Sequence, residues 1–564
     1  MVVVAWALVQ FIYLITNLAF HHTLTFAPVS PAEHSLGFSV VLVPVWGGLI
    51  IGVMARYGSK AIRGHGIPEA MEQILLNRSR IPARITVLKP VSAAISIGTG
   101  GPFGAEGPII ATGGALGSLV GQIFSVTATE RKTLLAAGAA AGMTAIFGTP
   151  VAAVLLAIEL LLFEFSVQSV VPVALACATA AASRIHFFGS EPIFAMPTVA
   201  VVGSTHLFVF LVMGLLIGVA AVAISRAVYW VEDQFERLPL HWMWWPAIGA
   251  FGVGLIGWFA PRTFGVGYNN IEDIVANSLP IQVVAWLCFL KLISWLIALG
   301  SGTSGGTLAP LLTIGGGMGA LLATLANHLF GGLDLPVGLA ALVGMAAMFS
   351  GASRALLAST VFAFETTMQP HALPALLAGG TAAFLVSHLL TRHSIMTEKI
   401  ARRGVTVPHQ YTPDPLAQIR VADVMASDFQ TVPAAMRVAE LAERIALNDP
   451  IVARRHASLI LDEAQQVVGI ITRSDVVRAS GSNGSDQTVR EAGASHLVVS
   501  YPDETLREAL SKMLQHEVGR LPVVDRGAPQ HAVGYLGRAE ILRAETLEAR
   551  EPGWLERLVT KAVP

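Results

Sequence analysis

The stretch 98–108, GTGGPFGAEGP, decides how this chain is built, because it sets a glycine-rich loop with one carboxylate, Glu106, between long apolar runs. Flanks of this length belong in a lipid bilayer, and a charge at membrane depth marks a functional site. Pro108 lies near the start of a new apolar helix, whose free N–H groups point back at the loop. Free N–H groups and the positive end of the helix dipole favour anions. The stretch therefore predicts an anion site where irregular backbone lines a cavity.

A second copy of this design lies at 300–321, GSGTSGGTLAPLLTIGGGMGAL. A shift of 202 residues matches Gly98, Gly100, Gly104, Pro108, Gly113, Gly114, Gly117 and Leu119 with identical residues of the second copy. Leu308 stands where the first copy has Glu106, and a weaker echo pairs the segments that end at Glu159 and Glu365. Such paired broken helices predict an inverted-repeat transporter. The loops 104–108 and 306–310 should converge near mid-membrane about a pseudo-two-fold axis.

The composition fits a polytopic membrane protein. The chain has 564 residues, of which 54% are hydrophobic and 13% charged, and its mean hydropathy is +0.63. The net charge of −1 argues against a nucleic-acid partner, and two cysteines in apolar runs support neither a disulfide framework nor a metal site. No lysine or arginine precedes Arg56, so the apolar start is interpreted as a retained membrane helix.

Apolar segments that predict membrane helices recur along residues 1–404. They lie near 2–20, 38–55, 85–97, 109–124, 134–163, 168–183, 206–229, 243–260, 281–299, 309–329, 335–364 and 372–390. Several are shorter than the ~20 residues of a full crossing, so half-spanning helices are expected. The positive-inside rule assigns two basic segments, 78–84 and 399–403, to the cytoplasm.

The composition changes to that of a soluble α/β protein after residue 405. A linker at 405–418 precedes two similar units, 419–480 and 487–546, and a tail at 547–564. The closing pieces GIITRSDVVRA and GYLGRAEILRA indicate a duplication, and the pattern resembles a tandem pair of CBS domains. That resemblance implies an adenine nucleotide held by Thr472 and Asp475, where the second unit has Gly537 and Glu540. A purely structural dimerisation module is the alternative.

The membrane part resembles the CLC family of chloride channels and proton-coupled chloride antiporters over nearly all of residues 1–404. The motifs that carry the resemblance are GHGIPE at 64–69, GAEGP at 104–108, GGTLAP at 305–310 and SIMTEKIARRG at 394–404. The resemblance implies an all-α fold with halves at about 1–195 and 205–404. It also implies a homodimer with one anion pathway per subunit, in a bacterial inner membrane with the CBS pair in the cytoplasm.

The resemblance also assigns site residues. Glu106 is the gate, because an ionised carboxylate competes for an anion site and protonation removes that competition. The implied anion-binding positions are Gly64, His65, Gly66, Ala105, Gly107, Thr307, Leu308 and Met396. This chain departs from the family pattern at three of them: Ala105 replaces a basic residue, His65 a serine and Met396 a tyrosine. His65 is expected to donate a ring N–H to the anion, more strongly when protonated.

Coupling to protons is the remaining question. Leu160 occupies the family's inner proton-relay position, and leucine carries no proton, which favours passive conduction. A relay through Glu159, Glu164 or His65 stays open, as does a purely structural Glu159 that caps a helix. Chloride is the first expectation; bicarbonate, nitrate and fluoride are the alternatives.

Two other classes of function are alternatives to anion transport: a cation transporter regulated by the CBS pair, and an intramembrane enzyme. A cation path needs several carboxylates or a carbonyl filter, and a hydrolase needs a nucleophile with its base or a metal-ligand set. The sequence has neither HExxH nor a clustered aspartate pair. We therefore expect a transport protein that is not an enzyme and that requires no metal or cofactor.

Overall fold

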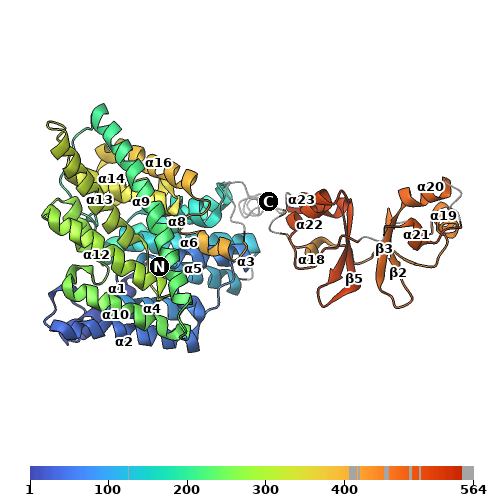
Figure 1. The fold of residues 1–564 in the computed structure, drawn as a ribbon, viewed down its shortest axis with the longest axis horizontal. Helices are drawn as coiled ribbons and strands as arrows, with labels where there is room; N and C mark the ends of the chain where they lie inside the picture. Colours follow the sequence, from blue (N-terminus) through green and yellow to red (C-terminus); the bar gives the residue numbers. More distant parts are fainter. Residues whose placement is uncertain are drawn as a thin grey trace, which may run out of the picture. The chain divides into compact units, whose positions relative to one another are not determined.

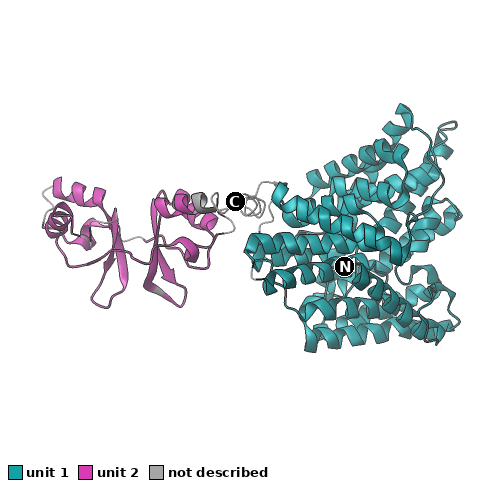
Figure 2. Cartoon of the chain, turned by 180° about the vertical axis from the view of Figure 1, so that it is seen from behind, with its two compact units in different colours: residues 1–412 teal, residues 413–564 magenta. Residues whose placement is uncertain are grey.

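The structure is a computed structural model that describes residues 1–124, 126–405, 416, 419–449, 452, 456–481, 486–494 and 497–548. The chain forms two compact units, Met1–Thr412 and Pro413–Pro564, which are described separately (Figure 2). Most of the predicted linker 405–418 and nearly all of the predicted tail 547–564 lie outside the described residues.

The first unit is a bundle of helices in two series that follow the same order, although counterpart helices differ in length (Figure 1). The first series is α1 (Val2–Thr16), α2 (Leu42–Val53), α3 (Ile67–Leu76), α4 (Ile85–Gly98), α5 (Glu106–Ile123), α6 (Ala128–Phe147), α7 (Pro150–Leu156) with the π-helical turn η6 (Ala157–Leu162), and α8 (Val167–Phe188). The second series is α9 (Ser204–Glu236), α10 (Trp245–Phe259), α11 (Tyr268–Val275), α12 (Ile281–Gly300), α13 (Leu308–Leu329), α14 (Val337–Ser353), α15 (Leu356–Thr367) and α16 (Leu373–Leu390). A short helix, α17 (Glu398–Arg402), follows.

Seven helical stretches among the described residues are long and apolar enough to cross a membrane. They are Val2–His21, Gly37–Gly58, Val167–Phe188, Ser204–Glu236, Ile281–Gly300, Leu308–Leu329 and Pro370–Leu390. Ile85–Gly98 and Leu356–Thr367 are among the shorter apolar helices. The predicted fold class, a polytopic helical membrane unit followed by a small α/β pair, is confirmed.

Two of the predicted apolar segments were wrong as single elements. The segment 134–163 divides into α6 and α7 because Gly148 ends α6 in the left-handed conformation (φ 67°) and Pro150 opens α7. The segment 335–364 divides into α14 and α15 at Arg354, which is also left-handed (φ 61°). Apolar residues continue across both breaks, so hydropathy alone conceals them.

Glycines let the central helices approach closely in both series. In α5 and α6, a Cβ added to Gly113 would overlap the carbonyl of Gly138, and one added to Gly138 would overlap that of Gly113. Gly315 of α13 and Gly344 of α14 make the same contact in the second series. Small residues are the usual means of close helix packing in membranes.

The second unit contains two small α/β subdomains, called here the first layer (β1 to α21) and the second layer (α22 to α23), each with its own apolar core. Its strands form a sheet of order β1-β2-β3 and a hairpin β4-β5. The elements are α18 (Val421–Val424), β1 (Thr431–Pro433), α19 (Val438–Ala446), β2 (Ala457–Leu461), β3 (Val467–Thr472), α20 (Arg473–Gly481), α21 (Val489–Ala492), α22 (Leu506–Gln515), β4 (Arg520–Asp525), β5 (Ala528–Gly537) and α23 (Arg538–Glu548). Bridges between Arg420 and Thr505 and between Ala426 and Tyr535 tie the segment that precedes the first layer to the second layer.

Candidate functional site

Glu106 is the first residue of α5, and its side chain is fully buried. Its Oε1 accepts a hydrogen bond of 3.2 Å from the hydroxyl of Tyr268, the first residue of α11. Its Oε2 has no hydrogen-bond partner among the described residues and lies against Gly104 and Gly306. The carboxylate thus occupies the start of a helix, where free N–H groups favour negative charge.

The two glycine loops meet at this carboxylate. Gly104 and Gly306 exchange backbone hydrogen bonds of 3.2 Å (Gly104 N to Gly306 O) and 2.9 Å (Gly306 N to Gly104 O). These glycines are 202 residues apart, so each is the counterpart of the other in its repeat. A reciprocal contact between counterparts places them about a pseudo-two-fold axis, and the predicted convergence of the two loops is confirmed.

Two glutamates give an independent sign of the same symmetry. Both oxygens of Glu159 accept from N–H groups in the first turn of α15, those of Leu357 and Ala358, at 3.0 Å each. Glu365 accepts from the first N–H groups of α7, those of Val151 (3.0 Å) and Ala152 (2.8 Å). Each glutamate therefore caps the helix that carries or precedes its counterpart in the other repeat.

Two buried lysines are also counterparts 202 residues apart. Lys89 on α4 donates to the carbonyls of Ile62 and Gly64, both at 2.8 Å. Lys291 on α12 donates to those of Thr263 (3.0 Å) and Gly265 (2.8 Å). Each lysine is essentially inaccessible to solvent and fixes the loop that leads into α3 or α11. Sequence reasoning missed this pair, although their 202-residue spacing was visible.

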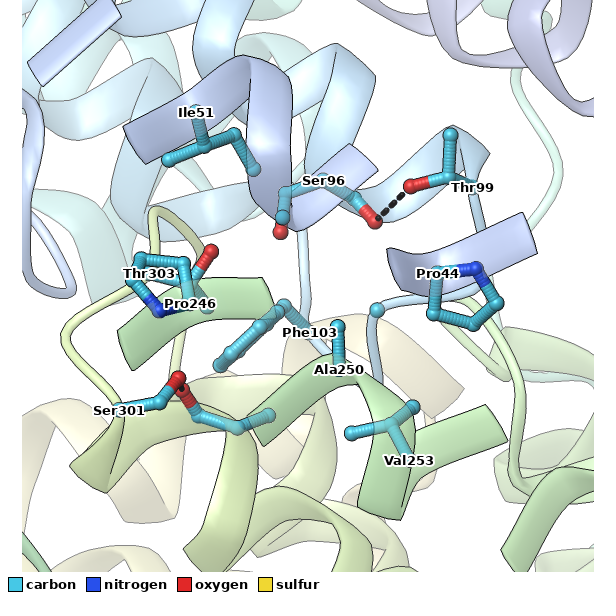
Figure 3. Close-up of a pocket in the computed structure, with 13 residues that line it drawn as sticks. Pro44, Ile51, Ser96, Thr99, Phe103, Pro246, Ala250, Val253, Ser301 and Thr303 are labelled. Atoms are coloured by element: carbon cyan, nitrogen blue, oxygen red, sulfur yellow. Dashed lines mark hydrogen bonds between the residues drawn. The ribbon is translucent and has the colours of Figure 1, made fainter. Parts of the chain in front are cut away.

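A cavity of about 20 Å³ lies between the repeats (Figure 3). Twelve of its thirteen lining residues form pairs that are 202 residues apart: Pro44 and Pro246, Gly48 and Ala250, Ile51 and Val253, Ser96 and Ala298, Thr99 and Ser301, Gly101 and Thr303. The thirteenth, Phe103, fills the space that a side chain at its counterpart Gly305 would need. The cavity therefore sits on the pseudo-two-fold axis beside the ends of α4 and α12.

The GHGIPE loop packs directly on the GAEGP loop. A Cβ on Gly107 would overlap the carbonyl of His65, and one on Gly66 would overlap the carbonyl of Gly107. His65 is buried, and its Nδ1 has no hydrogen-bond partner among the described residues. Thr307 immediately precedes α13, and its Oγ1 is likewise buried and unpartnered in the described part of the chain. Three of the predicted positions, His65, Glu106 and Thr307, thus carry buried polar atoms that the protein leaves unsatisfied.

The remaining predicted positions fall in the same region with less specific contacts. Ala105 and Leu308 are buried at the starts of α5 and α13. Gly64 forms a bridge with Ser304 of the second repeat. Met396 is buried, and its segment reaches the first motif through Lys399, whose Nζ lies 3.1 Å from Glu69 Oε1. Glu69 in turn accepts from the N–H of Gly66 at 2.6 Å.

The acidic side chains near Leu160 already have partners. Leu160 is buried in η6, next to the capping residue Glu159. Glu164 lies 3.4 Å from Lys132 and accepts a short hydrogen bond from Ser169. Both carboxylates therefore hold fixed positions in the packing.

Thr472 and Asp475 lie together at the junction of β3 and α20. The hydroxyl of Thr472 donates to Asp475 Oδ2 at 2.6 Å, and the backbone N–H of Thr472 donates to the same oxygen at 2.9 Å. Asp475 Oδ1 lies 3.2 Å from Arg478. In the second layer, Glu540 accepts from the N–H of Gly537 at 3.0 Å.

Comparison with known proteins identifies both units. The family model described as voltage gated chloride channel matches residues 47–388, and the CBS domain model matches 421–482 and 489–546. A putative chloride channel protein ClcB-like of Ralstonia nicotianae is 28% identical over 64% of this chain and 85% of its own length. The H(+)/Cl(-) exchange transporter ClcA of Vibrio campbellii is 29% identical over 64% of this chain and 81% of its own.

A solved structure shares the fold. The crystal structure of a slow cyanobacterial Cl-/H+ antiporter aligns with a TM-score of 0.62 at 22% identity, over 71% of this chain and 97% of that one. Since the family model covers more than half of the residues, this chain belongs to the voltage gated chloride channel (CLC) family of anion-transport proteins and carries two CBS domains.

Proposed function

We propose that the chain conducts chloride passively through a pathway gated by Glu106. The observation that carries the proposal is the position of the Glu106 carboxylate, fully buried at a helix start where the loops of both repeats join. A deprotonated carboxylate there occupies the place of an anion. Protonation removes the charge and lets the side chain leave.

The unpartnered atoms around the junction support an anion as the ligand. His65 Nδ1 and Thr307 Oγ1 are buried, and an ion supplies the contact that the protein does not. We propose His65 and Thr307, with the backbone of Gly64, Gly66, Ala105, Gly107 and Leu308 and the apolar surface of Met396, as the ion-binding set. Bicarbonate, nitrate and fluoride are tested against chloride in the same flux assay.

The residues near the inner relay position support the proposal of passive transport. Leu160 holds no proton, and the oxygens of Glu159 cap α15. Proton-coupled exchange is the second candidate, because a relative that is 29% identical bears the name H(+)/Cl(-) exchange transporter. A chloride gradient that drives protons uphill into liposomes would establish exchange; dissipation of the gradient without proton movement supports the passive pathway.

Replacing Glu106 with glutamine tests the gate. In the parent protein, flux should fall roughly tenfold for each pH unit above the midpoint, since opening requires one proton. In Glu106→Gln, flux should stay high and independent of pH, because the competing charge is gone. The measurement is chloride efflux from liposomes across the acid and neutral range. A pH profile that survives the substitution removes Glu106 from the mechanism.

We propose a homodimer in a bacterial inner membrane with the CBS domains in the cytoplasm. Lys399 pairs with Glu69, and Arg403 pairs with Glu72, so the basic segment 399–403 lies against α3. Helix α3 leads directly into the basic loop 78–84. Both basic segments therefore lie at one end of the unit, as the positive-inside rule requires for the cytoplasmic face.

We propose that the first CBS domain binds an adenine nucleotide at Thr472 and Asp475. Asp475 has to exchange its bonds with Thr472 and Arg478 for ribose hydroxyls, so binding should be weakened about tenfold or more in Asp475→Ala. Isothermal titration of the full chain in detergent with ATP, ADP and AMP measures this. Absence of heat with all three nucleotides makes the CBS pair a structural module.

A further inference from the structure

Tyr268 reaches Glu106 from the opposite repeat. Its hydroxyl donates to Glu106 Oε1 at 3.2 Å, and it opens α11 just as Ile67, 201 residues earlier, opens α3. The first repeat has no hydroxyl at the equivalent position. The hydroxyl that contacts Glu106 is therefore specific to the second repeat.

The ring of Tyr268 is held in place by aromatic neighbours. Its centroid lies 5.7 Å from that of Phe147 and 6.1 Å from that of Phe194, both in edge-on geometry. Phe147 is in turn packed edge-on against Phe362 at 4.9 Å. A ring confined in this way presents its hydroxyl at a fixed point, so little ordering is required when it bonds to the carboxylate.

The backbone before Tyr268 is braced as well. Lys291 binds the carbonyls of Thr263 and Gly265, and Gly267 adopts the left-handed conformation (φ 77°) that turns the chain into α11. Asn270 donates to the carbonyl of Arg262 at 2.8 Å and closes the same loop. The buried lysine thus positions the loop, and the loop positions the phenol.

We propose that Tyr268 is a positioning residue that latches the ionised Glu106 carboxylate inside the pathway and so sets the pH at which the gate opens. The proposal rests on Glu106 being the gate. A phenol that donates to a carboxylate stabilises its charged form more than its neutral form. The titratable or charged side chains that act on the pair are Lys291 on α12 and Tyr13 on α1, while His65, on the loop before α3, contacts the neighbouring Gly107 through its backbone carbonyl.

The test is Tyr268→Phe, which keeps the ring between Phe147 and Phe194 and removes only the hydroxyl. Without its donor the carboxylate takes a proton more readily, so the pH of half-maximal chloride flux should rise by about one unit. The matched control is Tyr229→Phe, which removes a buried hydroxyl that donates to the carbonyl of Ile395 at 2.7 Å. Its midpoint should stay that of the parent.

The Glu106→Gln background separates the two proposals. If Glu106→Gln keeps the parent pH profile, the gate itself is wrong. If its profile is flat but Tyr268→Phe leaves the parent midpoint in place, the latch is wrong and the gate stands. Should Tyr268→Phe fail to fold, 3-fluorotyrosine at this position supplies a stronger donor and should lower the midpoint; an unchanged midpoint contradicts the proposal.

Discussion

Gly104→Ala is expected to leave the pathway open at every pH. An added Cβ overlaps Oε2 of Glu106, and the three atoms nearest to that Cβ all belong to the Glu106 carboxylate. The flexible end of a side chain gives way more easily than backbone, so the carboxylate is expelled while the loop holds. The φ of Gly104 is not among the left-handed values, so alanine fits the backbone there. Chloride efflux at neutral pH should rise to the level of the parent at acid pH, which a liposome assay measures.

Two further glycine substitutions make this result specific. In Gly107→Ala the added Cβ overlaps the carbonyl of His65, a backbone atom, so this variant should lose folded protein instead of opening. In Gly203→Ala no atom lies within 4 Å of the added Cβ, so the pH profile should match the parent. Normal pH-dependent closure in well-folded Gly104→Ala would show that the carboxylate does not close the pathway from the position seen here.

Lys291→Met and Lys89→Met should each destabilise the protein strongly and by similar amounts. Methionine fills a similar volume but donates no hydrogen bond, so each substitution leaves two buried carbonyls unpaired. Relief of the cost of burying an ammonium group offsets part of this loss, and a net cost of about 2–4 kcal/mol is expected for each. Thermal denaturation in detergent, followed by the loss of the folded peak in size exclusion, measures the effect.

Lys60→Met is the matched control for the lysine pair. Lys60 is exposed, and its Nζ lies 5.3 Å from the centre of the Trp242 ring. An exposed cation–π contact contributes about 0.5–1 kcal/mol, so this variant should melt close to the parent. If Lys291→Met is no less stable than Lys60→Met, the lysine does not brace the loop before Tyr268.

The architecture was accessible from the sequence because the repeats share spaced glycines and prolines. The 202-residue shift predicted that the loops around Gly104 and Gly306 meet, and those two glycines hydrogen-bond each other. Glycine at a close backbone contact tolerates no substitute, so its spacing survives where most other positions differ between the repeats. The similarity between the segments that end at Glu159 and Glu365 reflects a shared role, because each glutamate caps a helix of the other repeat.

The contacts of the Glu106 side chain could not be predicted from the repeat spacing. Tyr268 follows Gly265 and Gly267, which match Gly64 and Gly66 of the first repeat, but the first repeat has Ile67 at the equivalent position. Its contact with Glu106 therefore has no counterpart that the repeat could reveal. Lys89 and Lys291 lie inside apolar runs, where a lysine shows no sign of its hydrogen-bond partners. The breaks at Gly148 and Arg354 were missed because apolar residues continue through both turns.

Anomalous X-ray diffraction from crystals grown in bromide tests most directly whether the repeat junction is the anion site. In Glu106→Gln, a bromide peak is expected at the junction, within contact of the backbone of Gly66, Gly107 and Leu308 and of the His65 ring. In the parent at neutral pH, the ionised carboxylate should exclude bromide from that position. Bromide bound equally in both proteins, or found only outside the junction in Glu106→Gln, would contradict the account.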